Sequence, residues 1–195
     1  MNKNEVLDTL KSWLEESDAI NDVFLKRAPE QGEATDDRIK YERVKPLVFS
    51  MIIPSAERAT AIKDFYPSPA ACILLYEGDE KGGLVSAGVR LNLSVFDPGE
   101  HEKDYLHGDA KKFTPDALGF QTLLSWSDKI TRAVAKNNII KNKIRVKSEK
   151  GVKSGVYGVD DSGTVVDTYP FYFGFVDFEI EFAKAAGAKN FDDLL

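Results

Sequence analysis

The sequence predicts an α+β fold, with a largely antiparallel, mixed β-sheet and an N-terminal helix and one long helix packed on one face. Apolar residues recur at helical spacing in residues 6–14 and 120–134, which predicts two helices. Residues 84–96 and 176–182 instead alternate apolar and polar side chains, as strands with one buried face do. The order helix, strands, long helix, strands lacks the regular alternation that builds a parallel sheet. We therefore expect a single domain over residues 1–195.

The first helix is predicted from its apolar face and its cap. Five apolar residues at spacings of three and four share one side of a helix: Val6, Leu7, Leu10, Trp13 and Leu14. Asn2 followed three residues later by Glu5 is the pattern of a capping box, in which each side chain bonds the other residue's backbone N–H. We expect this helix to pack on the sheet, and binding of a partner through the same apolar face is the alternative.

The residues after the first helix change in character. Residues 26–45 contain almost no large apolar side chain and show no period, so we expect an exposed or partly disordered loop. The apolar runs 47–53 and 71–76 are expected to be strands, the second buried on both sides as a central strand is. Residues 77–83 are rich in glycine and charge, and are expected to turn the chain into a hairpin that joins 71–76 to 84–96.

The long helix and the closing strand have recognisable boundaries. Thr114 is a good N-cap, Pro115 suits the first helical position, and Asn137 is expected to end the helix. In the closing strand, 176–182, the apolar even-numbered residues are expected to face the core. Its acids are expected to face outward: Asp177, Glu179 and Glu181. Residues 183–195 have little helical tendency and are expected to form a C-terminal tail.

The composition is that of an ordinary globular chain, with 195 residues, 43% of them hydrophobic and 30% charged, and a net charge of −6. A single cysteine, Cys72, excludes a disulfide scaffold. No apolar run approaches the roughly 20 residues of a membrane span. Acids stand where a signal peptide would be apolar, so the cytoplasm is the expected compartment. A pI near 5.1 argues against a dedicated nucleic-acid binder.

Charge is segregated along the chain. Residues 1–37 hold ten acids and four bases, residues 128–153 nine bases and two acids, and residues 160–195 eight acids and two bases. Within the basic block, Ile139–Val146 alternates apolar and basic residues and is predicted to be one strand. Its cations, with the one that follows, are expected on a single face: Lys141, Lys143, Arg145 and Lys147. The candidate inter-subunit or partner interface comprises these four cations and three acids of the closing strand: Asp177, Glu179 and Glu181.

Two other interpretations of the basic strand are open. Four cations on one face are also typical of the solvated side of an edge strand, where charge resists aggregation. Contact with nucleic acid bases is disfavoured, because no aromatic residue lies among these cations to stack on them. A polarised surface that meets an oppositely charged protein is therefore the functional expectation.

The sequence offers little for catalysis. The one cluster of metal-ligand residue types is His101–Asp109, and its two histidines, six positions apart on a loop, match no metal-binding motif. No glycine-rich phosphate loop and no G-x-S-x-G turn occurs. Cys72 lies in an apolar strand and is expected to be a buried structural thiol. We expect no enzyme, cofactor or metal, and a small metal-dependent enzyme that uses His101–Asp109 is the alternative.

The order of the elements resembles that of a known family. Its pieces are an apolar strand ending in proline, a strand opening with proline, an acidic turn, an alternating strand closed by an aromatic–Asp step, a long helix and an aromatic strand. Here they are Leu47–Pro54, Pro69–Glu77, Gly78-Asp79-Glu80, Val89–Val95 with Phe96-Asp97, Pro115–Asn137 and Tyr169–Glu179. This order, and above all the run Tyr-Pro-Phe-Tyr-Phe-Gly from Tyr169, resembles the tail terminator (tail-completion) proteins of long-tailed bacteriophages, in the form common in prophages of Gram-positive bacteria.

The resemblance implies a structural protein without catalysis or cofactor. Such subunits form a ring, typically a homohexamer, that caps the finished tail tube, ends its polymerisation and offers a surface to the head-completion or connector protein. DNA would only pass through the lumen, and no membrane would be involved. The protein would reside in the virion tail, after assembly in the host bacterial cytoplasm. A head–tail connector, neck or minor tail protein is the alternative from the same particle.

Three segments depart from the family pattern. Residues 26–43 are longer and more charged, residues 98–112 are extended, and the last thirteen residues are extra. Ring closure requires that one patch of a subunit meet a different patch on its neighbour. Basic and acidic blocks on one chain could supply such a pair, so we expect oligomerisation to weaken as salt is added.

Overall fold

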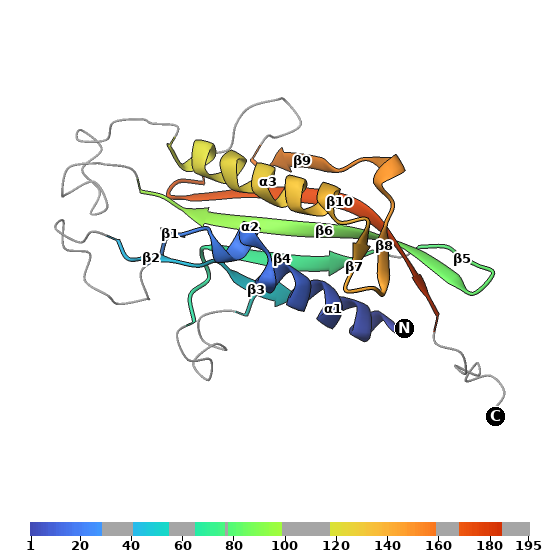
Figure 1. Cartoon of the computed structure of the whole chain (residues 1–195). Coiled ribbons are helices and arrows are strands. Elements are labelled where there is room, and N and C mark those ends of the chain that lie inside the picture. The colour runs from blue at the N-terminus through green and yellow to red at the C-terminus, as the bar shows by residue number, and fades with distance from the viewer. Residues whose placement is uncertain (29–40, 55–64, 77, 99–117, 159–167, 185–195) are drawn as a thin grey trace.

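The computed structural model describes residues 1–28, 41–54, 65–76, 78–98, 118–158 and 168–184. In these ranges the helices lie over one face of a mixed sheet, and no described helix covers the other face (Figure 1). The helices and the sheet share one hydrophobic core within the described part of the chain. The predicted α+β fold, with helices on one face of a largely antiparallel sheet, is confirmed.

The main sheet has eight strands, of which six form a continuous path. In spatial order the path is β3 (Leu47–Ser50), β4 (Ala70–Leu75), β6 (Leu84–Phe96), β10 (Phe171–Ala183), β8 (Ile144–Val146) and β7 (Ile139–Ile140). Two further strands pair off this path: β5 (Glu80–Lys81) with β6 and β9 (Lys153–Val156) with β10. β3 and β4 are parallel and every other pair is antiparallel, so the sheet is mixed as predicted.

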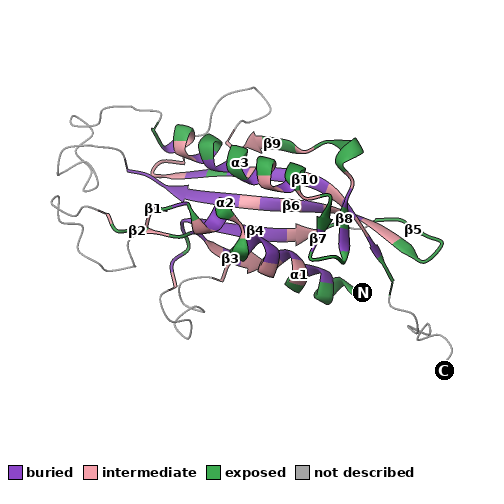
Figure 2. Ribbon diagram, viewed as in Figure 1, coloured by how far each residue is buried: buried purple, intermediate pink, exposed green. Residues whose placement is uncertain are grey.

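The two longest strands form the centre of the sheet. Each residue of β10 pairs with one of β6, from Phe171 opposite Phe96 to Ala183 opposite Leu84. Burial alternates along β10 and along most of β6, as the sequence predicts, but Ser94, Val95 and Phe96 at the end of β6 are all buried (Figure 2). A fully buried side chain such as Ile180 contributes roughly 1.5–3 kcal/mol to stability, so this inner face is a main source of folding energy.

The N-terminal helix, α1 (Lys3–Glu16), has the predicted cap and buried face. The Asn2 side chain accepts a hydrogen bond from the Glu5 backbone at 2.9 Å, and the Glu5 carboxylate accepts one from the Asn2 backbone at 3.0 Å, so the capping box is confirmed. A short helix, α2 (Asp18–Asn21), follows.

The long helix, α3 (Leu118–Lys136), ends just before Asn137 as predicted, whereas its predicted start at Thr114 and Pro115 lies outside the described residues. Its buried face includes Trp126, whose indole N–H donates to the Ala19 carbonyl at 2.9 Å and so joins α3 to α2.

The aromatic run that carries the family resemblance fastens α3 to the sheet. The Tyr172 ring packs edge-on against Phe120, with ring centres 4.8 Å apart. A Cβ at Gly119 would lie 2.0 Å from the Tyr172 ring, so only glycine lets the helix approach so closely. A Cβ at Gly174 would lie 2.7 Å from the backbone oxygen of Gly155 on β9. Tyr172 and Gly174 therefore have structural roles in this chain.

The predicted loop over residues 26–45 needs correction at both ends. Residues Leu25–Lys26 form β1 and Arg43–Val44 form β2, and the two strands pair with each other. The Lys26 ammonium lies 2.5 Å from the Asp97 carboxylate in a half-buried ion pair, which explains why a charged segment is ordered there. Residues 29–40, in the middle of the predicted loop, lie outside the described residues.

The prediction of one basic strand over Ile139–Val146 is wrong. The chain reverses between β7 and β8, because Lys141 and Asn142 both have positive φ, at 50° and 57°, and the Lys143 N–H bonds the Ile140 carbonyl at 3.0 Å. Two positive-φ residues in succession make the tight turn that matches strand twist, and asparagine tolerates this conformation. Apolar–polar alternation on each side of a short turn is easily mistaken for one strand. The four cations are thus not on one face of one strand.

The predicted tail over 183–195 begins inside the sheet, since Ala183 is the last residue of β10. Lys184 is also held, by an ion pair with Glu80 at 2.9 Å. Residues 185–195 lie outside the described part of the chain.

Candidate subunit-interaction surfaces

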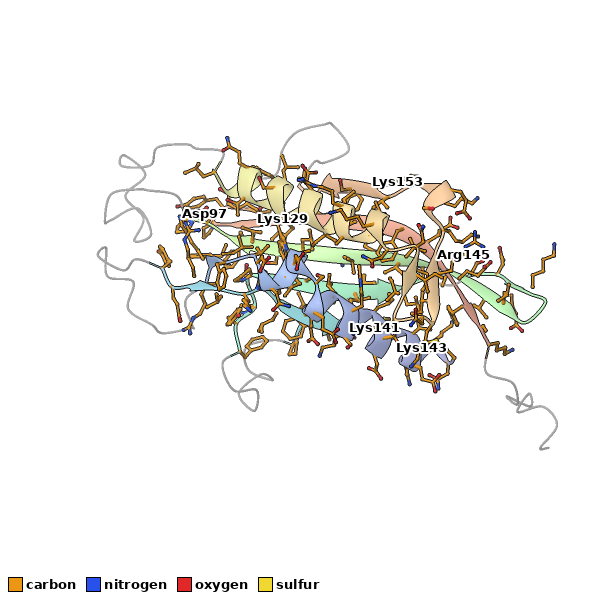
Figure 3. The ribbon with its side chains drawn as sticks, in the orientation of Figure 1. Asp97, Lys129, Lys141, Lys143, Arg145 and Lys153 are labelled. Carbon is orange, nitrogen blue, oxygen red and sulfur yellow. The ribbon has the colours of Figure 1, made fainter. Side chains whose placement is uncertain are left out.

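The tip of the β7–β8 hairpin places two of the predicted interface cations in different surroundings (Figure 3). Lys141 forms an ion pair with Glu16 at the end of α1, and hydrogen bonding from Lys141 lowers the pKa of the Glu16 carboxyl. Lys143 is exposed and has no ion-pair partner among the described residues. Lys141 therefore helps to hold the hairpin on α1, while Lys143 projects its charge into solvent.

The next two predicted cations pair with the acids that were expected to face a neighbouring subunit. Arg145 on β8 stands opposite Glu181 on β10, with 3.7 Å between their charged atoms. Lys147 lies 3.6 Å from Glu179, and its backbone N–H bonds the Glu179 carbonyl at 2.9 Å. Basic and acidic blocks that are separate in sequence thus lie on adjacent strands, where their charges offset each other within one chain.

The third acid, Asp177, pairs with a residue that the sequence did not single out. The Arg90 guanidinium donates to both carboxylate oxygens of Asp177, at 2.7 and 2.6 Å, which is a bidentate pair. It also lies 4.6 Å from the ring centre of Phe175 and 5.7 Å from that of Tyr76. Hydrogen bonding to Asp177 raises the pKa of Arg90, which stays protonated. The available signal was that Arg90 is the one charged residue in the alternating run 84–96.

A hollow of about 540 Å³ lies beside the Arg90–Asp177 pair, on the face of the sheet opposite the helices. Tyr76, Gly88, Lys150 and Lys153 contribute to its lining. The two lysines have no ion-pair partner among the described residues. The basic block contains no aromatic residue among its cations, yet the fold brings Tyr76, which follows β4, to the same hollow as these lysines. The hollow also contains the carboxylates of Asp177 and Glu179, which pair with Arg90 and Lys147.

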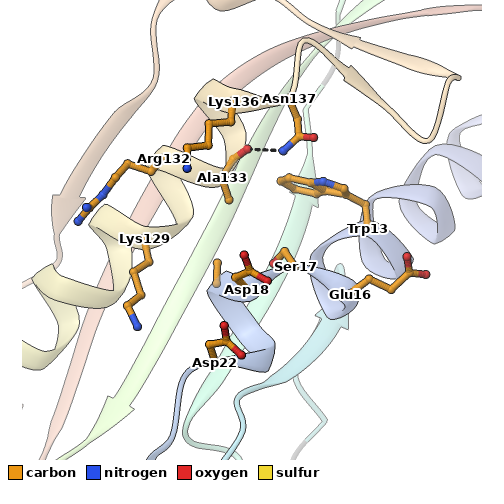
Figure 4. Close-up of a pocket in the computed structure, with 11 residues that line it drawn as sticks. Trp13, Glu16, Ser17, Asp18, Asp22, Lys129, Arg132, Ala133, Lys136 and Asn137 are labelled. Atoms are coloured by element: carbon orange, nitrogen blue, oxygen red, sulfur yellow. Dashed lines mark hydrogen bonds between the residues drawn. The ribbon is translucent and has the colours of Figure 1, made fainter.

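A groove runs along α3, between this helix and the segment formed by the end of α1, α2 and the residues that follow (Figure 4). It consists of two hollows, of about 540 and 450 Å³, that share Asp22 and Lys129. Both tryptophans of the chain contribute to the lining, Trp13 in the first hollow and Trp126 in the second. At 1.5 Å per residue, the 19 residues of α3 give the groove room to extend over roughly 28 Å.

The two walls of the first hollow carry opposite charge. Asp18 and Asp22 stand on the α2 side, and Lys129 and Lys136 on the α3 side, as Figure 4 shows. None of these four side chains has an ion-pair partner among the described residues. The second hollow is more apolar, and Phe24, with 51% of its surface exposed, contributes to it. The groove thus offers unpaired charges of both signs beside an exposed ring.

A hairpin projects from the other end of the sheet, where β5 turns into β6 (Figure 1). Gly82 and Gly83 form its turn with φ of 62° and 81°, a conformation that glycine adopts without strain. Lys184 braces it, since its backbone N–H bonds the Gly83 carbonyl at 2.9 Å and its ammonium pairs with Glu80. The hairpin is therefore a shaped projection with a fixed position relative to β10.

The remaining candidates from the sequence concern catalysis and membranes. His101–Asp109 lies outside the described residues, and the described ranges contain no group of three His, Cys, Asp or Glu placed to hold a metal ion. Cys72 is 4% exposed, and burial raises the pKa of its thiol, in keeping with the predicted structural role. Among the described helices, none is long and apolar enough to cross a membrane.

Neither a comparison with protein-family models nor one with curated proteins finds a match for this chain.

Proposed function

We propose that this chain is a structural subunit of a phage-type tail, a tail terminator that assembles into a ring on the end of the tail tube. The observation that carries the proposal is the aromatic run that begins at Tyr169, whose strand β10 pairs along the alternating strand β6, beneath the long helix. These are the pieces, in the order, on which the resemblance to tail terminators rests. The ring would stop tube polymerisation and present a surface to the head-completion protein.

The geometry also suits a subunit that meets copies of itself through unlike surfaces. The groove along α3 and the hairpin at Gly82 differ in shape, and the hairpin between β5 and β6 projects from the sheet beyond the helices that line the groove. Figure 1 shows β5 beyond the ends of α2 and α3. Contacts between unlike surfaces close into rings or continue as filaments, whereas contacts between identical surfaces stop at dimers. The charges left unpaired in the groove are available for such contacts.

Electron microscopy of the purified chain tests the proposal. We expect negative-stain images to show rings, with six-fold symmetry as the typical case, that dock on the ends of isolated tail tubes. Rings that bind head connectors and ignore tubes would favour the connector or neck alternative instead. A chain that stays monomeric at every concentration tested, with and without tubes, would contradict the proposal.

Metal analysis tests the enzyme alternative separately. That alternative requires His101–Asp109 to hold a divalent ion, so it predicts a bound metal in the purified protein, lost when both histidines are replaced by alanine. The structural proposal predicts that the same double substitution leaves ring formation unchanged. Stoichiometric bound metal that is lost when His101 and His107 are replaced would favour the enzyme alternative.

A further inference from the structure

The groove along α3 has the chemistry of a receptor for a polypeptide. A simple anion drawn to Lys129 would meet the carboxylates of Asp18 and Asp22 on the opposite wall, and a simple cation would meet the lysine. A ligand that satisfies both walls carries both signs of charge. The apolar end of the groove, with Phe24 and Leu118 at 51% and 43% exposure, favours an apolar side chain next to those charges.

The β5–β6 hairpin carries that set of groups. Lys81 and Asp79 are exposed and have no ion-pair partner among the described residues. Leu84 follows the turn with 45% of its surface exposed. The brace between Glu80 and Lys184 holds the hairpin in shape before any contact forms, which lowers the entropy cost of binding.

A chain does not bring its own hairpin to its own groove. β5 projects beyond the end of the sheet, and α2 lies toward the opposite end (Figure 1). The hairpin is tied to that end by Lys184 and, through β10, by the hydrogen bond from the Met1 ammonium to the Ala183 carbonyl at 2.5 Å. The groove of one chain is therefore open to the hairpin of another.

We infer that the β5–β6 hairpin of one copy docks in the α2–α3 groove of the next. Lys81 approaches the acids Asp18 and Asp22 on one wall, and Asp79 approaches Lys129 on the other. Leu84 packs at the apolar end of the groove. The contact joins unlike surfaces, so it can repeat from copy to copy, as a ring requires. This inference rests on the proposed function, because it names the contact between subunits of the proposed ring.

Engineered cysteines test the contact directly, because Cys72 is the one native cysteine and is buried. In the full chain carrying both Lys81→Cys and Ser125→Cys, one thiol lies on the hairpin and the other in the groove. We expect a short bis-maleimide crosslinker to give a ladder of covalent oligomers that ends at the ring. Each single variant should give no ladder beyond the wild-type background.

A matched control moves the second cysteine to a surface outside the contact. Lys153 on β9 is an exposed lysine, as Lys81 is. The pair Lys81→Cys and Lys153→Cys should give no ladder. A ladder from this pair, together with none from Lys81→Cys with Ser125→Cys, would overturn the inference.

Exchange of charge gives a second test that does not depend on crosslinking. Lys81→Glu places an acid opposite the acidic wall, and the double variant Asp18→Lys, Asp22→Lys places bases opposite Lys81. Each variant alone should assemble at least about tenfold more weakly than wild type, because like charges then face each other. An equimolar mixture should recover assembly, since each variant then finds an opposite charge on its neighbour. No recovery on mixing would contradict the proposed contact, provided that circular dichroism shows both variants folded.

The outcomes separate the contact from the function. Wild-type rings without the cysteine ladder overturn the hairpin–groove contact and leave the terminator proposal in place. A ladder from the variant with Lys81→Cys and Ser125→Cys, without wild-type rings that bind tubes, supports the contact and removes the terminator proposal. A chain that is monomeric by light scattering and gives no ladder overturns both.

Discussion

The β8–β10 boundary and the α3 groove both contain acids and bases drawn from charged blocks of the sequence, but only the first brings them into contact. In the sheet, neighbouring strands lie about 4.8 Å apart, so Arg145 meets Glu181 and Lys147 meets Glu179. In the groove, helical elements hold the walls apart, and the charges of Asp22 and Lys129 remain unpaired within the described chain. The first arrangement stabilises the fold, and the second leaves charge for a partner.

The backbone in the paired region should be the least tolerant of change. Gly174→Ala places a Cβ 2.7 Å from the Gly155 carbonyl oxygen, so β9 or β10 must shift. We expect a loss of about 3 kcal/mol in unfolding free energy, measured by urea denaturation. Gly88→Ala is the matched control in the same sheet, because its Cβ meets Tyr76 at an ordinary 3.6 Å. Equal losses for the two variants would show that close packing at Gly174 is not limiting.

Removal of the Arg90–Asp177 pair should cause the next largest loss of unfolding free energy. Each side chain is about 30% exposed, so removal of one partner leaves a charge that water reaches only in part. We expect Arg90→Met and Asp177→Asn each to lower the unfolding free energy by about 1–2 kcal/mol. The double variant should cost less than the sum, because the two residues contact each other. Additive losses would mean that the bidentate pair contributes nothing of its own.

Added salt should change ring formation through the groove more than it changes the stability of the folded monomer. Ring formation through exposed groove charges should weaken as salt rises from low to physiological ionic strength, since a Debye length of about 8 Å screens them. Unfolding of the monomer should change less, because its core is apolar. Sizing by light scattering and urea denaturation at the same salt concentrations measures both. Mass that does not depend on salt would assign the interface to apolar contacts alone.

The helices and strands could be predicted because each follows from a local pattern of residue types. The capping box at Asn2, the alternation along 84–96 and the end of the long helix at Asn137 all follow from spacing and residue type. The β7–β8 turn was missed because apolar residues alternate on both sides of Lys141 and Asn142, and only the positive φ of these two residues reveals the reversal. Propensity for that turn is weak without glycine.

The interaction surfaces could be predicted less well, because pairing depends on register. Nothing local to Arg145 or Glu181 shows that thirty-six positions of separation end in a cross-strand pair. Arg90 was missed for the same reason, since its partner Asp177 lies 87 positions away. The groove depends on the spacing between the helices, and that spacing is set by side-chain packing alone. A charged block of the sequence therefore predicts whether a surface is acidic or basic only when the pairing of the strands is known.

We expect the smallest effect at the Lys141–Glu16 pair. Its side chains are exposed like the groove charges, but they form an ion pair like the charges on the sheet. Hydrogen bonding from Lys141 lowers the pKa of Glu16 below its ordinary 4.5 in the folded chain. The stabilisation is therefore present above pH 4.5 and is lost as pH falls through the folded-state pKa. Lys141→Met should lower stability slightly above pH 4.5 and leave it unchanged below the folded-state pKa, so the acid side of the stability profile becomes flatter. Urea denaturation across that range measures both parts. If the variant loses unfolding free energy at acid pH as steeply as wild type, the Lys141–Glu16 pair does not contribute to stability. The hairpin would then depend on β8–β10 pairing alone.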